Sequence, residues 1–220
     1  MKTIARIASM DARWLDRRTI ARAAEILRRG AVVVFPTSGL YGLGADAFND
    51  RAVARIFDLK GRDPAKPLLV LVDSPEMVGR VAQPPSALAR HLMTCFWPGR
   101  VTLVVPALSG LPLGLTAPDG TIGVRQVAHP VAAALVRALG GPLTGTSANL
   151  SGAGGCASVA GLDPAIRAAV DLVMDAGPLV GHPGSTVVEV KEKSVTIVRE
   201  GVVPRAQIMA AVEQFAAATY

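Results

Sequence analysis

The segment AVVVFPTSGLYGLGADAFND, residues 31–50, begins with five apolar residues and passes into a stretch rich in glycine. The apolar, β-branched run predicts a buried strand over 31–35. Gly42, Gly44 and Ala47 match the spacing of a dinucleotide-binding turn, but that turn needs its glycines directly after the strand. Here residues 36–41 intervene, so the segment indicates a strand followed by a glycine-rich turn and not a Rossmann nucleotide site.

Helical and strand patterns alternate on both sides of this segment. Apolar residues recur at helical spacing over 18–29 and 51–61, with Ile20, Ala23, Ala24 and Leu27 on one face of the first and Val53, Ile56 and Phe57 on one face of the second. Further helices are expected over 129–141 and after Pro204, and further strands over 67–72, 101–106, 121–125, 185–190 and 195–200. The expected fold class is α/β, or mixed α+β, in one compact unit over 1–220.

The charge balance favours an anionic ligand. Lys and Arg number 23 against 17 Asp and Glu, a net charge of +6, so the surface should attract nucleotides, phosphates or RNA. Aromatic residues make up only 4%, too few for a base-stacking surface. Composition therefore points to a small anionic ligand or to contacts with a nucleic-acid backbone.

Several other classes of protein are disfavoured. The cysteines, Cys95 and Cys156, form no CxxC pair, and the three histidines show no metal spacing. P-loop, HExxH and GxSxG motifs are missing, so no metal site is expected. Because the apolar runs are strand-sized and no signal peptide is evident, we expect a cytoplasmic protein without a membrane partner.

Two polar stretches are candidates for a site. Lys60, Arg62 and Lys66 lie within seven residues at the start of a strand, as either a solvated face or a phosphate-binding cluster. The second stretch, GPLTGTSANLSGAGG (141–155), carries small hydroxyl and amide side chains among glycines directly after a helix. Such a stretch would let phosphates approach the backbone closely.

Seven segments, in order along the chain, resemble the YrdC-like family of threonylcarbamoyl-AMP synthases. The resemblance spans residues 18 to about 203, and its distinctive pair is Lys-x-Arg (Lys60, Arg62) followed far downstream by Ser-x-Asn (Ser147, Asn149). The segments are FPTSGLYGLGADA, AVARIFDLKGRDPAKPLLVLV, WPGRVTLVV, TIGVRQVAHPVAAALV, PLTGTSANLSG, STVVEV and VREG. The resemblance implies a single catalytic domain with a twisted mixed β-sheet, surrounded by helices, and a basic concave cavity.

The resemblance also implies a reaction and its partners. L-Threonine, bicarbonate and ATP, with Mg²⁺, would give threonylcarbamoyl-adenylate and pyrophosphate for the threonylcarbamoyladenosine modification of tRNA. The adenylate would pass to downstream tRNA threonylcarbamoyl-transfer proteins, and tRNA binding is a further expectation.

Residue roles follow from the same resemblance. Lys60, Arg62, Ser147 and Asn149 are expected to be catalytic and to bind ATP, with both cations in the cavity and not in the core. The remaining expected ATP contacts are Thr121 and Arg199. The expected L-threonine contacts are Thr37, Lys66, Arg125 and Ser185, and Tyr41 would wall the cavity.

The chain departs from the family pattern at the expected cavity rim. Ser38 and Gly39 stand where the family has an acidic residue and a threonine, and Asp63, Arg100 and Val127 stand where it has proline. Strict selectivity for threonine is therefore in question, and a paralogue with a different carbamoyl acceptor is one alternative. A non-catalytic RNA-binding module is the other. Carbamoyl transfer in a larger maturation enzyme is disfavoured because such enzymes carry zinc-type cysteine motifs.

Overall fold

The computed structural model describes residues 6–9 and 16–219. Its strands are β1 (Arg6–Ser9), β2 (Val33–Pro36), β3 (Tyr41–Gly44), β4 (Leu69–Val72), β5 (Val101–Pro106), β6 (Thr121–Gln126), β7 (Leu143–Ser147), β8 (Leu172–Asp175), β9 (Thr186–Val190) and β10 (Val195–Arg199). Its helices are α1 (Arg17–Arg28), α2 (Asp50–Lys60), α3 (Pro75–Val78), α4 (Ala87–Phe96), α5 (Pro130–Leu139), α6 (Pro164–Ala169) and α7 (Arg205–Thr219), with a 3₁₀ turn η1 (Val159–Gly161).

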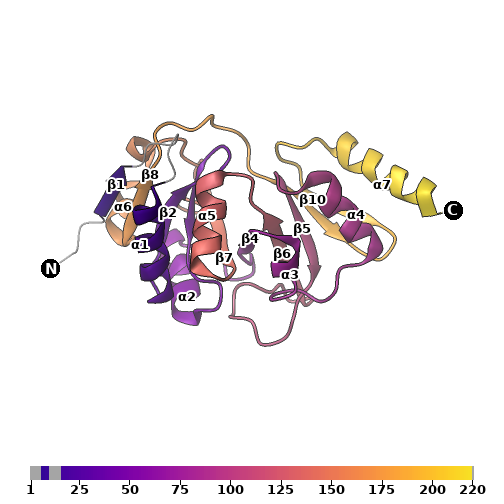
Figure 1. Ribbon diagram of the computed structural model, residues 1–220, viewed down its shortest axis with the longest axis horizontal. Helices are drawn as coiled ribbons and strands as arrows, with labels where there is room; N and C mark the ends of the chain where they lie inside the picture. The colour runs from indigo at the N-terminus through magenta and orange to yellow at the C-terminus, as the bar shows by residue number, and fades with distance from the viewer. Residues whose placement is uncertain (1–5, 10–15, 220) are drawn as a thin grey trace.

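These strands form one mixed sheet in the order β1-β8-β2-β3-β7-β4-β6-β5-β9-β10. The sheet contains both parallel pairs, such as β4 with β6, and antiparallel pairs, such as β5 with β6. Helices surround the sheet, with α1, α2, α5 and α6 around one end and α4 and α7 around the other (Figure 1). The expected mixed α/β class and helix-covered sheet are confirmed.

Strand β7 joins the two halves of the sheet. Thr146 and Ser147, at its C-terminal end, pair with β3, whereas residues 143–145 pair with β4. One half contains β1, β8, β2 and β3, and the other contains β4, β6, β5, β9 and β10. Leu143 also bridges Asp46, beyond β3, so β7 is shared by the two halves along its length, with Ser147 at its C-terminal end.

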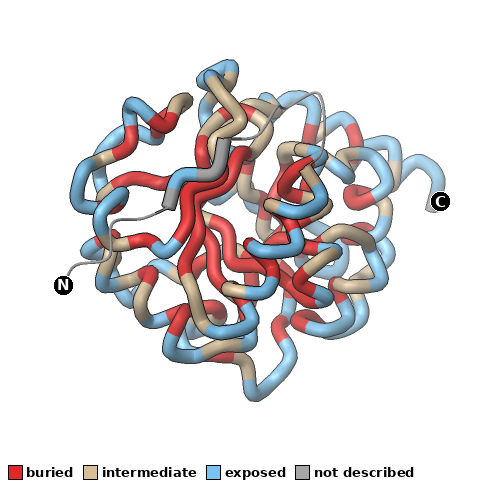
Figure 2. Tube along the Cα trace, turned by 60° about the vertical axis from the view of Figure 1, so that its left-hand side comes forward, coloured by how far each residue is buried: buried red, intermediate tan, exposed pale blue. Residues whose placement is uncertain are grey.

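Apolar side chains fill both faces of the sheet. Leu27 of α1 and Leu135 of α5 belong to the same buried cluster as Val33 and Phe35 of β2. A larger cluster on the other face includes Ile56 of α2 and Leu92 of α4. Figure 2 shows the buried strands at the centre of the molecule, with exposed segments outside them.

The ends of α2 fix the position of the predicted basic cluster. The Asn49 side chain accepts a hydrogen bond from the Ala52 N–H and caps the helix start. Gly61, at φ 54°, ends the helix in the left-handed conformation that glycine adopts without strain. The chain turns sharply there, so Lys60 and Arg62 on either side of Gly61 meet different surroundings.

The expected strands and helices are found, with bounds shifted by a few residues, but glycine-rich strands were missed. Residues 41–44 form β3 where the sequence indicates a turn, and β7 was not expected. The reason is space: a Cβ at Gly44 would lie 2.6 Å from the Thr144 carbonyl oxygen, and a Cβ at Gly145 would lie 2.8 Å from Leu71 Cγ. Glycine weakens a strand in general, but here it allows close packing.

No helix in the described ranges is long and apolar enough to cross a membrane.

Candidate active site

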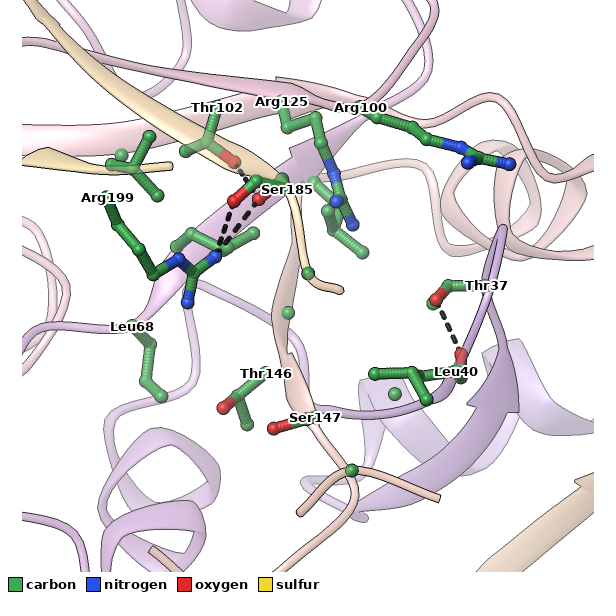
Figure 3. A pocket seen from close by; sticks show the side chains of 18 of the residues that line it. Thr37, Leu40, Leu68, Arg100, Thr102, Arg125, Thr146, Ser147, Ser185 and Arg199 are labelled. Atoms are coloured by element: carbon green, nitrogen blue, oxygen red, sulfur yellow. Dashed lines mark hydrogen bonds between the residues drawn. The ribbon is translucent and has the colours of Figure 1, made fainter. Parts of the chain in front are cut away.

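A cavity of about 1050 Å³ lies where the two halves of the sheet meet. Residues of both halves line it, including Phe35 and Gly42 from one side and Val104 and Val187 from the other. Its polar lining residues are Thr37, Ser38, Arg62, Lys66, Arg100, Thr102, Asp119, Thr121, Arg125, Thr146, Ser147, His182, Ser185, Glu189 and Arg199, and Figure 3 shows several of them around the space.

The cavity carries an excess of positive charge. Five Lys and Arg side chains line it, namely Arg62, Lys66, Arg100, Arg125 and Arg199, against the carboxylates of Asp119 and Glu189. Charges of one sign in a cleft with low-dielectric walls focus the electric field and concentrate ions of the opposite sign. The site is therefore suited to a polyanion.

Arg125 is the cation with the most unusual surroundings. It projects from β6 toward the open space (Figure 3), and its buried Nε has no hydrogen-bond partner among the described residues. Burial and the nearby Arg199 lower the pKa of its guanidinium to about 10, so it stays charged at neutral pH. A buried donor without a partner is costly, and a bound carboxylate or phosphate would satisfy it.

Arg199 and Ser185 form a second cluster. The Arg199 Nη2 donates to the Ser185 carbonyl at 2.7 Å, and the buried Ser185 and Thr102 hydroxyls lie 2.8 Å apart within hydrogen-bond distance (Figure 3). These bonds fix the side chains at the edge of the β5–β9 pair. The rest of the exposed Arg199 guanidinium is free to face a ligand.

Arg62 and Lys66 come from the loop between α2 and β4. The Arg62 Nε donates to the Lys66 carbonyl at 2.7 Å, and its Nη2 donates to the Pro67 carbonyl at 3.0 Å. Burial, followed by the charge of Arg199, lowers the pKa of the Arg62 guanidinium. Arg62 thus holds its own loop in shape while lining the cavity, and Lys66 remains exposed.

Lys60 departs from its expected place. It is only 3% exposed and does not line the cavity; its Nζ donates to the carbonyls of Ser147 at 2.6 Å and Asn149 at 2.5 Å. The Asn149 amide is also turned away, donating to the carbonyls of Leu150 and Ala153. Lys60 is therefore not the cavity cation that we expected, because the carbonyls of the Ser-x-Asn turn bind its amino group. Its role toward ATP, like that of Asn149, stays a prediction.

The hydroxyl residues are positioned by local hydrogen bonds. The Thr37 Oγ1 donates to the Leu40 carbonyl at 2.6 Å, and the Thr121 Oγ1 donates to Asp119 at 2.7 Å. Both residues line the cavity, as does Ser147. Tyr41 also lines the cavity, as expected; its hydroxyl donates to the Gly177 carbonyl at 2.8 Å, and burial raises the pKa of this phenol to about 12.

The structure thus brings most predicted site residues to one cavity. Those on its wall are Thr37, Tyr41, Arg62, Lys66, Thr121, Arg125, Ser147, Ser185 and Arg199, whereas Lys60 and Asn149 lie behind it. Thr102, Glu189 and His182 were not predicted. Thr102 and Val104 of β5, like Val187 and Glu189 of β9, are alternate residues, and the two-residue period of these strands could have revealed them.

Comparisons with known proteins identify the relatives of this chain. A family model described as Sua5_yciO_yrdC, telomere recombination, matches residues 25–201. The chain is 35% identical to threonylcarbamoyl-AMP synthase of Bacillus subtilis over 88% of its own length and 56% of the relative's, so it spans little more than half of that protein. A putative threonylcarbamoyl-AMP synthase of Mycobacterium leprae is 38% identical over 87% of this chain and 86% of the relative.

Two solved structures share the fold of this chain. The structure of Pyrococcus abyssi Sua5 complexed with L-threonine matches with a TM-score of 0.85 and 31% identity, over 95% of this chain and 61% of that one. Escherichia coli YciO matches with a TM-score of 0.79 and 27% identity, over 91% of this chain and 97% of that one. With a family model matching most of its length and a fold shared with these structures, the chain belongs to the Sua5/YciO/YrdC family.

Proposed function

We propose that this chain is a threonylcarbamoyl-AMP synthase. The observation that carries the proposal is a cavity between the two sheet halves that holds an excess of guanidinium groups, one of them with a buried N–H lacking a partner. Relatives of similar length and sequence carry this name, and one structural neighbour was solved with L-threonine. The substrates are proposed to be L-threonine, bicarbonate and ATP.

The size of the cavity agrees with two reactants. Pockets for a single small ligand range from about 300 to 1,000 Å³. The cavity measures about 1050 Å³, which leaves room for a nucleotide beside an amino acid. Arg125 would bind the threonine carboxylate as a bidentate pair, and Arg62, Arg199 and Lys66 would neutralise the triphosphate.

The proposed reaction needs no side-chain nucleophile. The threonine amine and bicarbonate condense to a carbamate with loss of water. A carbamate oxygen then attacks the α-phosphorus of ATP; the new P–O bond forms while the bond to the β-phosphate bridging oxygen breaks, and pyrophosphate leaves with those electrons. Because one anion attacks another, the protein contributes by holding both reactants in place and by offsetting their negative charge with fixed cations.

Mg²⁺ is proposed to enter together with ATP. No group of three or more His, Cys, Asp or Glu that could hold a metal lies together within the described ranges. Mg²⁺ commonly keeps several of its waters and binds phosphate oxygens, so it would be held mainly by the ATP phosphates. Ser147, on the cavity wall, would contact its hydration shell; the ion, when bound, would supply charge neutralisation at the phosphates.

Pyrophosphate release tests the proposal. Purified protein is incubated with ATP, Mg²⁺ and bicarbonate, with and without L-threonine, and the product is identified by mass. Threonine-dependent release and the mass of threonylcarbamoyl-adenylate are expected. Release with another amino acid alone would favour a paralogue with a different acceptor, and RNA binding without any turnover would favour the RNA-binding alternative. Transfer of the product to a tRNA-modifying partner stays a prediction, as does a cytoplasmic location.

A further inference from the structure

The connection from β8 to β9, residues 176–185 and called the strap below, passes between the two halves of the sheet beside the cavity. In Figure 1 it is the long orange connection along the upper side of the molecule. Hydrogen bonds hold it at three points: Gly177 accepts from the Tyr41 hydroxyl, Leu179 donates to Ala157 at 2.7 Å, and Gly181 donates to the Gly39 carbonyl at 2.9 Å. The strap is therefore held by β3, by the segment around Ala157 and, near the cavity, by the turn that follows β2.

Gly39 lies directly against His182 of the strap. A Cβ at position 39 would lie 2.9 Å from His182 Cβ, 3.1 Å from its backbone nitrogen and 3.3 Å from its Cδ2. Gly39 does not have the positive φ that requires glycine. Glycine is present here because His182 occupies the adjoining space, and not because the backbone conformation demands it.

The His182 side chain is available to a ligand. It is half-buried and lines the cavity together with Thr37, Ser38 and Gly39. None of the hydrogen bonds found among residues 6–9 and 16–219 involves its imidazole ring, whereas the neighbouring Thr37 and Ser185 hydroxyls both have partners. An imidazole has one donor and one acceptor in its neutral form, so it can contact a hydroxyl group as well as pack against a methyl group.

The contact between Gly39 and His182 lies at one of the positions where this chain departs from the family pattern. By the resemblance, the family has threonine at the position of Gly39, so this chain lacks a side chain there, in the turn that also carries the expected threonine contact Thr37. The strap supplies a larger side chain in the same place. His182 of the strap therefore forms the cavity wall beside position 39.

We propose that Gly39 and His182 form a specificity-determining pair, in which the His182 imidazole takes the space beside position 39 and contacts the side chain of the amino-acid substrate. The proposal rests on the proposed function for the choice of substrate. It assigns selectivity among small amino acids with a β-hydroxyl to a residue of the strap and not to the turn after β2.

Reciprocal variants test the pair: His182→Ala, His182→Gly, Gly39→Ala and the double variant Gly39→Ala/His182→Gly. Gly154→Ala is the matched control, because nothing lies within 4 Å of a Cβ built there and its φ is not positive. For each variant, kcat and KM are measured with L-threonine, L-serine and L-valine, together with the Tm. L-Threonine binding is measured separately by calorimetry without ATP.

His182→Ala is expected to lower the preference for threonine over serine and valine by tenfold or more, measured as the ratio of kcat/KM values, with kcat for threonine changed less than threefold. Gly39→Ala should raise the KM for threonine at least tenfold. The double variant should recover much of that loss, because removing the His182 Cβ leaves only the backbone nitrogen at 3.1 Å.

Failure of the pair and failure of the proposed function are separable. If wild type binds and uses threonine but His182→Ala changes the selectivity no more than Gly154→Ala does, the pair is overturned and the function stands. A fall in Tm without a change in selectivity likewise makes His182 a packing residue. If wild type uses another amino acid in place of threonine, the proposed function is wrong, and a His182-dependent preference for that amino acid would still support the pair.

Discussion

Replacing Lys60 by methionine tests whether its buried ammonium stabilises the Ser-x-Asn turn. Methionine keeps an unbranched apolar stem but cannot donate to the carbonyls of Ser147 and Asn149, which accept at 2.6 and 2.5 Å. Hydrogen bonds from a charged donor contribute about 1.5 to 3 kcal/mol each, so the two lost bonds cost about 3 to 6 kcal/mol. The bond to the Asn149 carbonyl is buried, so water replaces that lost donor poorly.

The free-energy cost of burying the charged Lys60 amino group in wild type partly offsets the loss of these hydrogen bonds. Burial, with a smaller effect of the Arg62 charge, lowers the pKa of Lys60 from 10.5 to about 8, which corresponds to about 3 kcal/mol against the charged form. Methionine removes that penalty. The Lys60→Met protein should therefore be less stable by up to about 3 kcal/mol at pH 7.5.

The difference should widen as the pH rises. Because the folded-state pKa of Lys60 lies below its unfolded value, the unfolded chain binds more protons between pH 8 and 10.5, and the stability of wild type increases with pH there. The penalty is fully present below about pH 8 and is lost above 10.5. Wild type should gain about 2 kcal/mol over Lys60→Met between pH 7.5 and 9.5.

Urea denaturation at both pH values measures this difference, with Lys66→Met as control because Lys66 is exposed. The control should match wild type within about 0.5 kcal/mol. A difference between wild type and Lys60→Met that stays constant or shrinks from pH 7.5 to 9.5 would refute the burial of the ammonium. Equal stability of Lys60→Met and wild type at both values would refute the hydrogen bonds.

Three further outcomes are expected. Arg125→Gln should raise the KM for L-threonine about 10- to 100-fold in steady-state assays, since a charge-assisted pair is lost, and should leave the Tm nearly unchanged because the Arg125 Nε has no partner among the described residues. Tyr41→Phe should lower the free energy of unfolding by about 1 to 3 kcal/mol in urea denaturation, because the Gly177 carbonyl loses its donor. Gly145→Ala should cost about 1 to 3 kcal/mol in the same assay, since its Cβ would lie 2.8 Å from Leu71 Cγ; a fully stable variant would contradict the close packing of β7 on β4.

The parts of the fold with a regular apolar period were predictable. The helix over 18–29 buries Ile20, Ala23, Ala24 and Leu27 as expected, and the strand over 101–106 has the predicted bounds. Strands β3 and β7 were not predictable in this way, because glycines at Gly42, Gly44 and Gly145 suppress the usual strand signal. Glycine is needed there because a neighbouring strand lies close to the backbone. A local sequence pattern carries no information about that distance.

The candidate site was predictable as a set of residues but not as a geometry. Nine of the site residues that the resemblance named line the cavity. It also suggested that Lys60 and Arg62, two positions apart, both bind ATP from the cavity wall. The left-handed turn at Gly61 separates them, sending Lys60 into the protein and Arg62 to the cavity wall. His182 carries no motif of its own, and its contact with Gly39 depends on two segments far apart in the chain.

The position of β7 as the strand shared by both halves of the sheet has a mechanical consequence for the cavity. On one side it pairs with β3 and, through Leu143 and Asp46, with the chain that follows β3; on the other side residues 143–145 pair with β4. A small torsion of β7 would therefore rotate one half of the sheet against the other and change the width of the space between them. A ligand that contacts both walls would resist that torsion, so hydrogen exchange of the β7 amides should slow when nucleotide and amino acid are bound together.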